Sequence, residues 1–210
     1  MKKPVDASAI GREEASTLWL HSVMPMVTVT KTVKVSRIVR LARKHGLKFN
    51  ALLCYCIVKT ASEIPEFHNT LEQEQFFIYD TMAVQVIVYS HSGRLRFCDV
   101  PYSGSLQQFL SDYAKYTRMV FDSDEHNLFT DRAVVGTSAL PGMEIDSVVN
   151  QYLGTWNNPF LVWGRYRREF LFRYHLPISL QFHHVLMDGS HVVRFFNGLQ
   201  KNIDCLSLLS

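Results

Sequence analysis

The stretch from Gln181 to Gly189, Gln-Phe-His-His-Val-Leu-Met-Asp-Gly, restricts the fold more than any other part of the chain. The residues from Leu176 to His184 are mostly apolar or otherwise suited to a β-strand. Asp188-Gly189 is a strong turn dipeptide, and a helical pattern follows from Ser190. The sequence therefore predicts a strand, a tight turn and a helix in succession, with two adjacent histidines where the strand ends.

Length and composition indicate one ordinary globular domain spanning residues 1–210. The chain is 47% hydrophobic and 20% charged, and its 210 residues are enough to build a full hydrophobic core. No long Pro/Gly/Ser linker divides it. The net charge is only +3, and the one basic cluster, from Gly164 to Glu169, is too short for a nucleic-acid-binding stripe. We interpret that cluster as a solvated turn between two strands.

The cysteines and the N-terminus favour a reducing compartment, and the cytoplasm is the expected location. Cys54, Cys56, Cys98 and Cys205 lack metal-ligand spacing and are expected to be buried free thiols. The N-terminal residues include Lys2 and Lys3 but no apolar segment typical of a signal peptide. No run of about 18 apolar residues predicts a membrane span.

Helical and strand patterns are mixed along the chain, which predicts an α+β fold with a mixed, largely antiparallel sheet and helices packed on one side. Ser36, Asn50 and Ser105 are expected helix caps, and Gly46 is an expected helix stop. The predicted helices are Arg12–Ser22, Arg37–His45, Ala51–Ser62, Ser105–Phe121 and Ser190–Asp204. The predicted strands are Met24–Val33, Phe76–Tyr79, Ala83–Tyr89, Leu95–Val100, Ala133–Ala139, Phe160–Tyr166, Glu169–Tyr174 and Leu176–His184, with a hairpin between Phe160–Tyr166 and Glu169–Tyr174. No glycine-rich phosphate loop opens any of these helices, so a Rossmann or P-loop nucleotide site is not supported.

Adjacent strand residues point to opposite faces, so His183 and His184 cannot share one task. We expect one to be packed and the other to face a cleft, where a neutral imidazole can take a proton from a hydroxyl. Asp188 could hold the turn through an ion pair with an arginine. The alternatives are two core histidines beside an exposed aspartate, or a metal site. The complete pattern His-His-x-x-x-Asp-Gly favours a functional site. The divergence of the histidines and the lack of HExxH or CxxC count against a metal, and the absence of GxSxG counts against a hydrolase triad.

This pattern, continued by His191-Val192-Val193-Arg194-Phe195, resembles the active-site signature of the chloramphenicol acetyltransferase family. Thr137-Ser138-Ala139-Leu140-Pro141 resembles that family's Ser-Ala-Leu-Pro segment, and Arg12 with His21 is a weaker third match. Lipoyl-dependent acyltransferases and peptide-synthetase condensation domains share the histidine signature. Ser138 and the short chain favour the chloramphenicol acetyltransferase type.

The resemblance implies a two-layer acyltransferase fold and a role for each matching residue. His184 would be the general base for transfer of acetyl from acetyl-CoA directly to a hydroxyl of chloramphenicol, without a covalent acyl-enzyme. Ser138 would donate a hydrogen bond to the tetrahedral oxyanion. Asp188 would be structural and paired with Arg12, beside a structural His183. No metal is implied.

The resemblance also implies a CoA site and an assembly. Pro141 matches a residue beside the CoA adenine, and Arg165-Tyr166 match a basic and aromatic pair at the nucleotide end of CoA. Taken singly, each of these also fits an ordinary turn proline or hairpin residue. Family members are homotrimers with active sites between subunits, so a homotrimer is expected, with no nucleic-acid or membrane partner.

The positions that match the acceptor pocket depart from the family pattern. Trp19 stands in place of a tyrosine, Val23 and Val27 in place of larger residues, and Val162 in place of a threonine, while Gly142 replaces a tryptophan. Three hypotheses stay open: acetylation of chloramphenicol, the same chemistry on another small hydroxyl acceptor, or an inactive trimeric binding protein of the same fold. The presence of His184, Ser138, Asp188 and Arg12 argues against the third.

Overall fold

The structure, a computed structural model, describes residues 2–152, 154 and 156–208. Its helices are η1 (Ser8–Ile10), α1 (Glu13–Trp19), α2 (Ser36–His45), α3 (Phe49–Ser62), η2 (Pro65–His68), α4 (Leu106–Ser123) and α5 (Gly189–Asp204). Its strands are β1 (Lys2–Val5), β2 (Met26–Lys34), β3 (Asn69–Glu72), β4 (Gln75–Tyr79), β5 (Met82–Tyr89), β6 (Leu95–Pro101), β7 (Ala133–Leu140), β8 (Phe160–Gly164), β9 (Arg167–Phe170) and β10 (Arg173–His183). None of the helices in these residues is long and apolar enough to cross a membrane.

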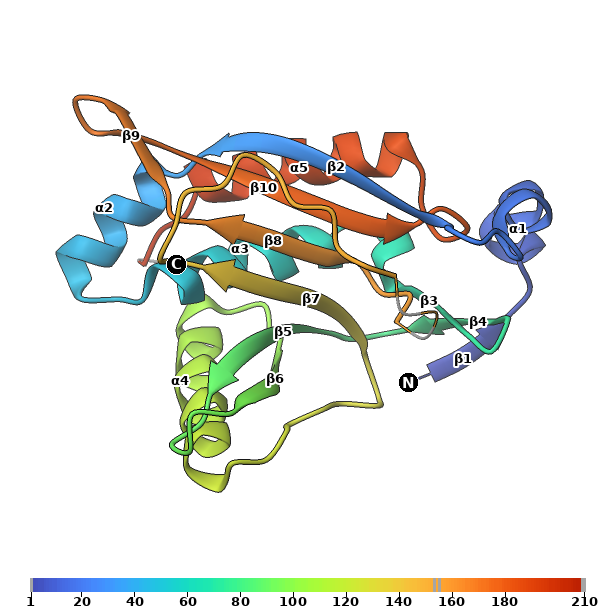
Figure 1. The fold of residues 1–210 in the computed structure, drawn as a ribbon, viewed down its shortest axis with the longest axis horizontal. Helices are drawn as coiled ribbons and strands as arrows, with labels where there is room; N and C mark the ends of the chain where they lie inside the picture. Colours follow the sequence, from blue (N-terminus) through green and yellow to red (C-terminus); the bar gives the residue numbers. More distant parts are fainter. Residues whose placement is uncertain (1, 153, 155, 209–210) are drawn as a thin grey trace.

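A seven-stranded sheet forms the centre of the molecule, with strand order β2-β10-β8-β7-β5-β6 and β9 paired to one end of β10 (Figure 1). β10 runs antiparallel to β2 and β8, and β5 runs antiparallel to β6. β7 is parallel to both of its neighbours, β5 and β8. The predicted α+β fold with a mixed sheet is therefore confirmed.

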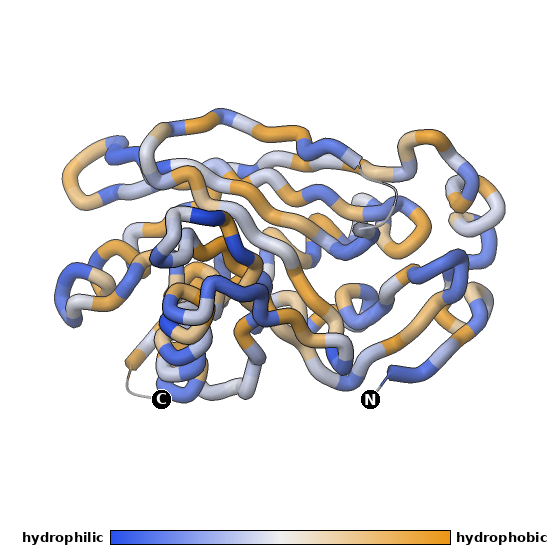
Figure 2. Tube along the Cα trace, turned by 60° about the horizontal axis from the view of Figure 1, so that its bottom comes forward, coloured by the Kyte–Doolittle hydropathy of each residue, from blue (hydrophilic) through white to orange (hydrophobic). Residues whose placement is uncertain are grey.

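Helices α2, α3, α4 and α5 pack on one side of this sheet, as predicted, whereas α1 lies beyond its end (Figure 1). On β10, Leu176, Ile178, Leu180 and Phe182 alternate toward this layer and are buried in the core. Helix α3 lies at the centre of the layer and is apolar almost all round, with ten buried residues, because it packs against both the sheet and other helices. Figure 2 shows hydrophobic stretches along the central strands and a mixture of both colours around α4.

The opposite face of the sheet is more polar. Ser179, Gln181 and His183 of β10 point to it, because they alternate with the core residues of the same strand. The segment that follows β7 crosses this face in front of β8 and β10 (Figure 1). It is held there by hydrogen bonds from the Val148 backbone N–H to Ser179 Oγ (2.9 Å) and from Gln181 Nε2 to the Asn150 carbonyl (2.8 Å).

Two of the three predicted helix caps are wrong. Ser36 and Asn50 lie inside the first turns of α2 and α3, whose N-caps are Val35 and Lys48. Their side chains accept hydrogen bonds from distant donors instead, Ser36 from the Tyr174 backbone and Asn50 from the Trp163 indole. Ser105 does cap α4, and Gly46 ends α2 in the left-handed conformation, both as predicted.

The predicted hairpin between Phe160–Tyr166 and Glu169–Tyr174 is also wrong. β8 ends at Gly164, and the chain forms a separate strand, β9, where a solvated turn was expected. The hairpin joins β9 to β10 and reverses at Leu171 and Phe172, where Phe172 has a positive φ of 62°. A bulky residue rarely adopts this conformation, so the turn carries no recognisable sequence signal.

A second sheet, the length of α1 and the exposure of one cysteine also differ from the predictions. A second, three-stranded sheet of order β1-β4-β3 was not predicted beyond β4. α1 is shorter than the predicted helix, because Arg12 is its N-cap and it ends at Trp19. Cys205 is exposed, whereas Cys54, Cys56 and Cys98 are buried as expected.

Candidate active site

The two histidines at the end of β10 have different environments. His183 is 1% exposed, and its Nδ1 accepts a hydrogen bond from the Val185 backbone N–H (3.2 Å). Burial, and then the neighbouring His184, lower the pKa of His183 to about 4, so this ring is neutral near pH 7. The prediction that one of the two histidines is packed agrees with this arrangement, and the cleft expected beside the other stays a prediction.

His184 is partly exposed just after the strand, and aromatic contacts hold its ring. The Trp19 side chain stacks on the imidazole, with ring centroids 5.0 Å apart and an angle of 4° between the planes. Phe182 contacts it edge-on at 6.4 Å. Among the described residues, none hydrogen-bonds to the buried Nδ1 of His184. Stacking therefore orients this imidazole without engaging that nitrogen.

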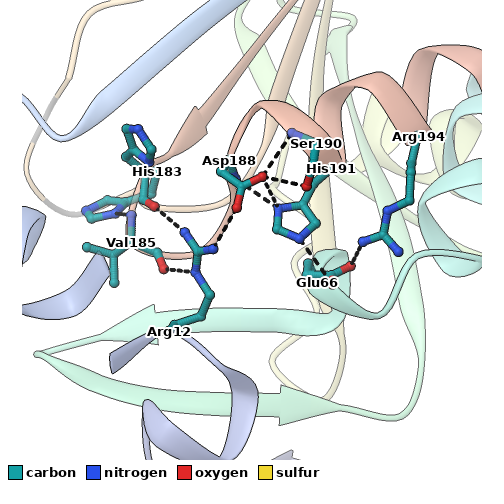
Figure 3. A network of polar contacts seen from close by, with 9 residues as sticks. Arg12, Glu66, His183, Val185, Asp188, Ser190, His191 and Arg194 are labelled. Carbon is teal, nitrogen blue, oxygen red and sulfur yellow. Dashed lines mark hydrogen bonds and ion pairs between the residues drawn. The ribbon is translucent and has the colours of Figure 1, made fainter. Parts of the chain in front are cut away.

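Arg12 holds the backbone of the turn from the other end of the chain (Figure 3). Its Nη2 donates to the His184 carbonyl (2.7 Å), and its Nε donates to the Val185 carbonyl (2.8 Å). Its Nη1 donates to Asp188 Oδ2 (3.0 Å). The main chain at His184 is further fixed where its N–H donates to the Pro25 carbonyl (2.8 Å). One guanidinium, 7% exposed, thus satisfies three acceptors of the turn, as its fork of donors allows.

Asp188 joins the turn to helix α5. It is the N-cap of that helix, and its Oδ1 accepts hydrogen bonds from the Ser190 backbone N–H (2.9 Å) and the Ser190 hydroxyl (2.7 Å). Burial by itself would raise the pKa of Asp188, but the hydrogen bonds from Ser190 and Arg12 lower it to about 2. Asp188 is therefore charged at neutral pH, and it stabilises both Arg12 and the start of the helix.

A further group of charged side chains continues from Asp188. The Asp188 backbone N–H donates to His191 Nδ1 (2.9 Å), which completes a capping box at the start of α5. His191 Nε2 lies 3.2 Å from Glu66 Oε1, and Arg194 is bound to the other oxygen of Glu66. Figure 3 shows these residues as one continuous network from Arg12 to Arg194. Glu66 carried no signal in the sequence that linked it to the histidines.

Ser138 lies elsewhere in the same chain. It is in register with Val162 of β8, and Val162 is in register with Ser179 of β10. His184 follows Ser179 by five residues and lies just beyond the end of β10. With about 3.3 Å per strand residue and about 4.8 Å between strands, Ser138 and His184 are roughly 19 Å apart. One chain therefore does not bring the two predicted catalytic residues together.

The four predicted acceptor residues are likewise not brought together by one chain. Trp19 lies on His184, whereas Val162 lies beside Ser138. Val27 is in register with Phe182 and packs against the core, and Val23 is 96% exposed. Of the weaker N-terminal match, Arg12 reaches the turn, whereas His21 is exposed and lies 3.6 Å from Glu74.

The predicted CoA-binding residues line one cavity. A hollow of about 620 Å³ is bounded by Pro141, Arg165 and Tyr166, which the sequence singled out, and by Lys48, Phe49, Asn50, Tyr113 and Gly164. Lys48 supplies a second cation there and was missed, because nothing in the local sequence distinguishes it from a solvated lysine. The Tyr166 ring packs on Phe49, with centroids 4.9 Å apart.

A second cavity leads from this hollow to Ser138. β5 and β7 pair over Met82–Gln85 and Ala133–Gly136, and a space of about 290 Å³ lies beyond the paired part. Ser138 lines this space, and Asn50, Tyr113 and Pro141 line both cavities. The two cavities are therefore adjacent, and together they form a path from Lys48 and Arg165 to the Ser138 segment. Within residues 2–152, 154 and 156–208, no group of three His, Cys, Asp or Glu side chains could hold a metal ion.

The fold is shared with solved structures of chloramphenicol acetyltransferase and dihydrolipoamide acetyltransferase. A solved structure described as chloramphenicol acetyltransferase superposes with a TM-score of 0.82 at 21% identity, covering 97% of this chain and 100% of the other. A dihydrolipoamide acetyltransferase from Azotobacter vinelandii superposes with a TM-score of 0.68 at 17% identity, covering 95% of this chain and 88% of the other. That structure comes from work on the role of a serine, a histidine and an asparagine in the catalytic mechanism of that enzyme.

The family model described as chloramphenicol acetyltransferase matches residues 2–200, so the chain belongs to the chloramphenicol acetyltransferase family. Chloramphenicol acetyltransferase 3 from Escherichia coli is 25% identical over 198 residues, covering 90% of this chain and 91% of the relative. A chloramphenicol acetyltransferase from Clostridium perfringens is 24% identical over 207 residues, covering 95% and 97%. Family membership makes this chain an acyltransferase.

Proposed function

We propose that this protein transfers acetyl from acetyl-CoA directly to a hydroxyl of chloramphenicol, with His184 as general base and Ser138 as oxyanion donor. The observation that carries the proposal is the presentation of His184. Its backbone is fixed by Arg12 and Pro25 and its ring is oriented by Trp19, and because Nδ1 is buried, Nε2 is the nitrogen that would take the proton. A neutral imidazole that is held in place but not consumed by a structural bond suits proton transfer.

The reaction balances without a covalent enzyme intermediate. His184 takes the proton of the acceptor hydroxyl as the oxygen attacks the thioester carbonyl carbon. The negative charge that develops on the carbonyl oxygen receives a hydrogen bond from the Ser138 hydroxyl, a contact worth roughly 3 kcal/mol in the transition state. The intermediate then expels the CoA sulfur, which takes the proton back from His184, and leaves an acetyl ester and free CoA.

The two adjacent cavities support the placement of CoA. Lys48 and Arg165 supply positive charge for phosphate groups, and Tyr166 and Pro141 offer flat apolar surfaces for the adenine. The narrower space between β5 and β7 would hold the extended arm of CoA and bring the thioester to Ser138. Arg165 lies 3.8 Å from Glu144 and would exchange this exposed contact for phosphate.

The separation of Ser138 and His184 supports an active site shared between subunits. A distance of roughly 19 Å is too great for both side chains to act on one carbonyl, because reacting groups and hydrogen-bond donors must lie within about 3–3.5 Å. A neighbouring chain of a homotrimer would supply the missing partner. Trp19 would then accompany His184 from one subunit, and Val162 would accompany Ser138 from the other.

The activity is tested by the release of CoA thiol from acetyl-CoA, with and without chloramphenicol, for the wild type and His184→Ala. We expect chloramphenicol-dependent release in the wild type and none in the folded variant. Release that depends on His184 but occurs only with another small hydroxyl compound would replace chloramphenicol as the acceptor. If the wild type releases no more thiol than His184→Ala with any acceptor, the chain is a binding protein of this fold.

The shared site is tested by mixing two inactive variants, His184→Ala and Ser138→Ala, through co-expression. In a cyclic oligomer assembled at random, about a quarter of the interfaces combine an intact His184 with an intact Ser138. We expect the mixture to recover up to that fraction of wild-type activity. If each chain carried its own complete site, every site would contain one of the two substitutions, and the mixture would be no more active than either variant alone.

A further inference from the structure

We infer that His191, together with Glu66, is a positioning residue that fixes the turn carrying His184. This inference rests on the proposed role of His184, and it concerns how the imidazole is held there. Arg12 and Asp188 hold the turn from the side of the N-terminus. His191 and Glu66 hold it from the side of α5 and η2 (Figure 3).

The hydrogen bonds assign one tautomer to His191. Its Nδ1 lies 2.9 Å from the Asp188 backbone N–H and 3.1 Å from Asp188 Oδ1; because the N–H can only donate, Nδ1 accepts from it and carries no proton. The proton of the neutral ring therefore lies on Nε2, where Glu66 Oε1 accepts it at 3.2 Å. The ring is 9% exposed, and both nitrogens have protein partners.

The carboxylates around His191 are each paired with a cation. Asp188 and Glu66 are the negative groups that face it, and each is paired with an arginine. Arg12 neutralises Asp188 from the N-terminal segment, and Arg194 neutralises Glu66 from the next turn of α5. The imidazole is thus free to act as an acceptor for the turn and as a donor to η2.

The connection to His184 passes through consecutive short contacts. Glu66 fixes the ring of His191, and His191 fixes the backbone of Asp188. Asp188 binds Arg12 at 3.0 Å, and Arg12 binds the His184 carbonyl at 2.7 Å. Without His191, the Asp188 N–H loses its partner and one of the two bonds of the capping box. The turn then keeps its contacts with Arg12 but loses its hydrogen bond to the His191 ring.

The inference is tested with His191→Leu, which removes both contacts, and with His191→Gln, whose side-chain oxygen can accept from the N-cap backbone as in a standard capping box. His175→Leu is the matched control. It removes another histidine and glutamate pair, in which Nδ1 lies 3.0 Å from Glu169, at the opposite end of β10. The first readout is the imidazole signal of His184 in protein with ¹³C-labelled histidine, assigned by its absence in His184→Ala. The second is kcat and KM for acetyl-CoA in the thiol-release assay.

We expect His191→Leu to shift the His184 signal and to lower kcat by roughly 10- to 100-fold, because small displacements of a reacting group cost that much. KM for acetyl-CoA should change less than about twofold, since the cation and aromatic sites are remote. His191→Gln should restore most of the signal and the activity, and His175→Leu should alter neither.

A folded His191→Leu protein with an unchanged His184 signal would overturn the inference, and so would a His191→Gln protein as impaired as His191→Leu. If His191→Leu does not fold, Glu66→Ala leaves the helix cap in place and should shift the His184 signal in the same direction, and no shift would overturn the inference. If the wild type releases no thiol in a His184-dependent way, the proposed function fails, whereas the imidazole signals still decide the role of His191.

Discussion

Replacing Asp188 with asparagine removes the charge opposite Arg12 while keeping a good helix cap, since asparagine is among the best N-cap residues. The substitution therefore removes the charge of Asp188, which Ser190 and Arg12 both stabilise, without removing the cap. Arg12 is 7% exposed and would lose its counter-charge but keep its two carbonyl partners. We expect Asp188→Asn to lower both the free energy of unfolding and the activity.

The size of the effect on stability follows from the pKa of Asp188. The pKa falls from 3.8 to about 2 in the folded protein, which corresponds to about 2.5 kcal/mol without screening by solvent. The side chain is 38% exposed, so we reduce the expected loss to about 1–2 kcal/mol. Because the pKa of Asp188 is lower in the folded protein than in the unfolded chain, its charge stabilises the fold fully at pH values above 3.8. This contribution disappears as the pH falls toward about 2.

Urea unfolding at pH 7 and at pH 3 measures how far the free energy of unfolding differs between the wild type and Asp188→Asn, with both proteins at the same subunit concentration. The two proteins should differ by about 1–2 kcal/mol near pH 7, and roughly half of that difference should be gone by pH 3. A difference below about 0.5 kcal/mol at pH 7 would show that the Arg12 and Asp188 contact is energetically negligible. A larger difference that does not change with pH would show that the charge of Asp188 is not its cause.

Three further experiments test other parts of the structure. Gly136→Ala should destabilise the protein by about 1–3 kcal/mol in urea unfolding, because a Cβ there would lie 2.3 Å from the Phe160 ring. Gly142→Ala places a Cβ with no atom within 4 Å and should be neutral, so equal urea midpoints for the two variants would contradict this. Thiol titration should find Cys205 reactive in the native protein and Cys54, Cys56 and Cys98 reactive only after unfolding, since burial raises the pKa of the last three well above the usual range; two rapidly reacting thiols per native chain would refute it. Lys48→Gln and Arg165→Gln should each raise KM for acetyl-CoA roughly tenfold with little change in kcat, whereas the control Arg118→Gln, on the exposed side of α4, should leave KM unchanged. An unchanged KM in the first two variants would place the CoA phosphates elsewhere.

The local patterns were sufficient to predict the centre of the fold. The rule that neighbouring strand residues face opposite ways was correct for β10, whereas Asp188 and Gly189, expected to form the turn, are the N-cap and the first residue of α5. The caps at Ser36 and Asn50 were wrong because both side chains bind donors that lie more than 100 residues away. The β9–β10 hairpin was missed because its turn contains Leu171 and Phe172 in place of glycine, proline or asparagine.

The site was predictable in a similarly uneven way. The different environments of His183 and His184 follow from strand geometry, but the pairing of Arg12 with Asp188 followed from the family resemblance alone. Lys48 and Glu66 were not predicted, because neither has a neighbour in sequence that shares its role. The division of Ser138 from His184 depends on strand register, which composition and periodicity do not determine.

The contact between Arg12 and Asp188 joins residues that are 176 positions apart, and this has a consequence for biosynthesis. At 5–20 residues per second, a ribosome needs roughly 10–35 s to add the residues between them. During that time the guanidinium has no carboxylate to bind, and β2 has no β10 to cover its inner edge. The segment that contains Arg12 and β2 must therefore wait until β10 and Asp188 have been made, and slow translation of the residues between them would prolong its exposure to proteases and to other nascent chains.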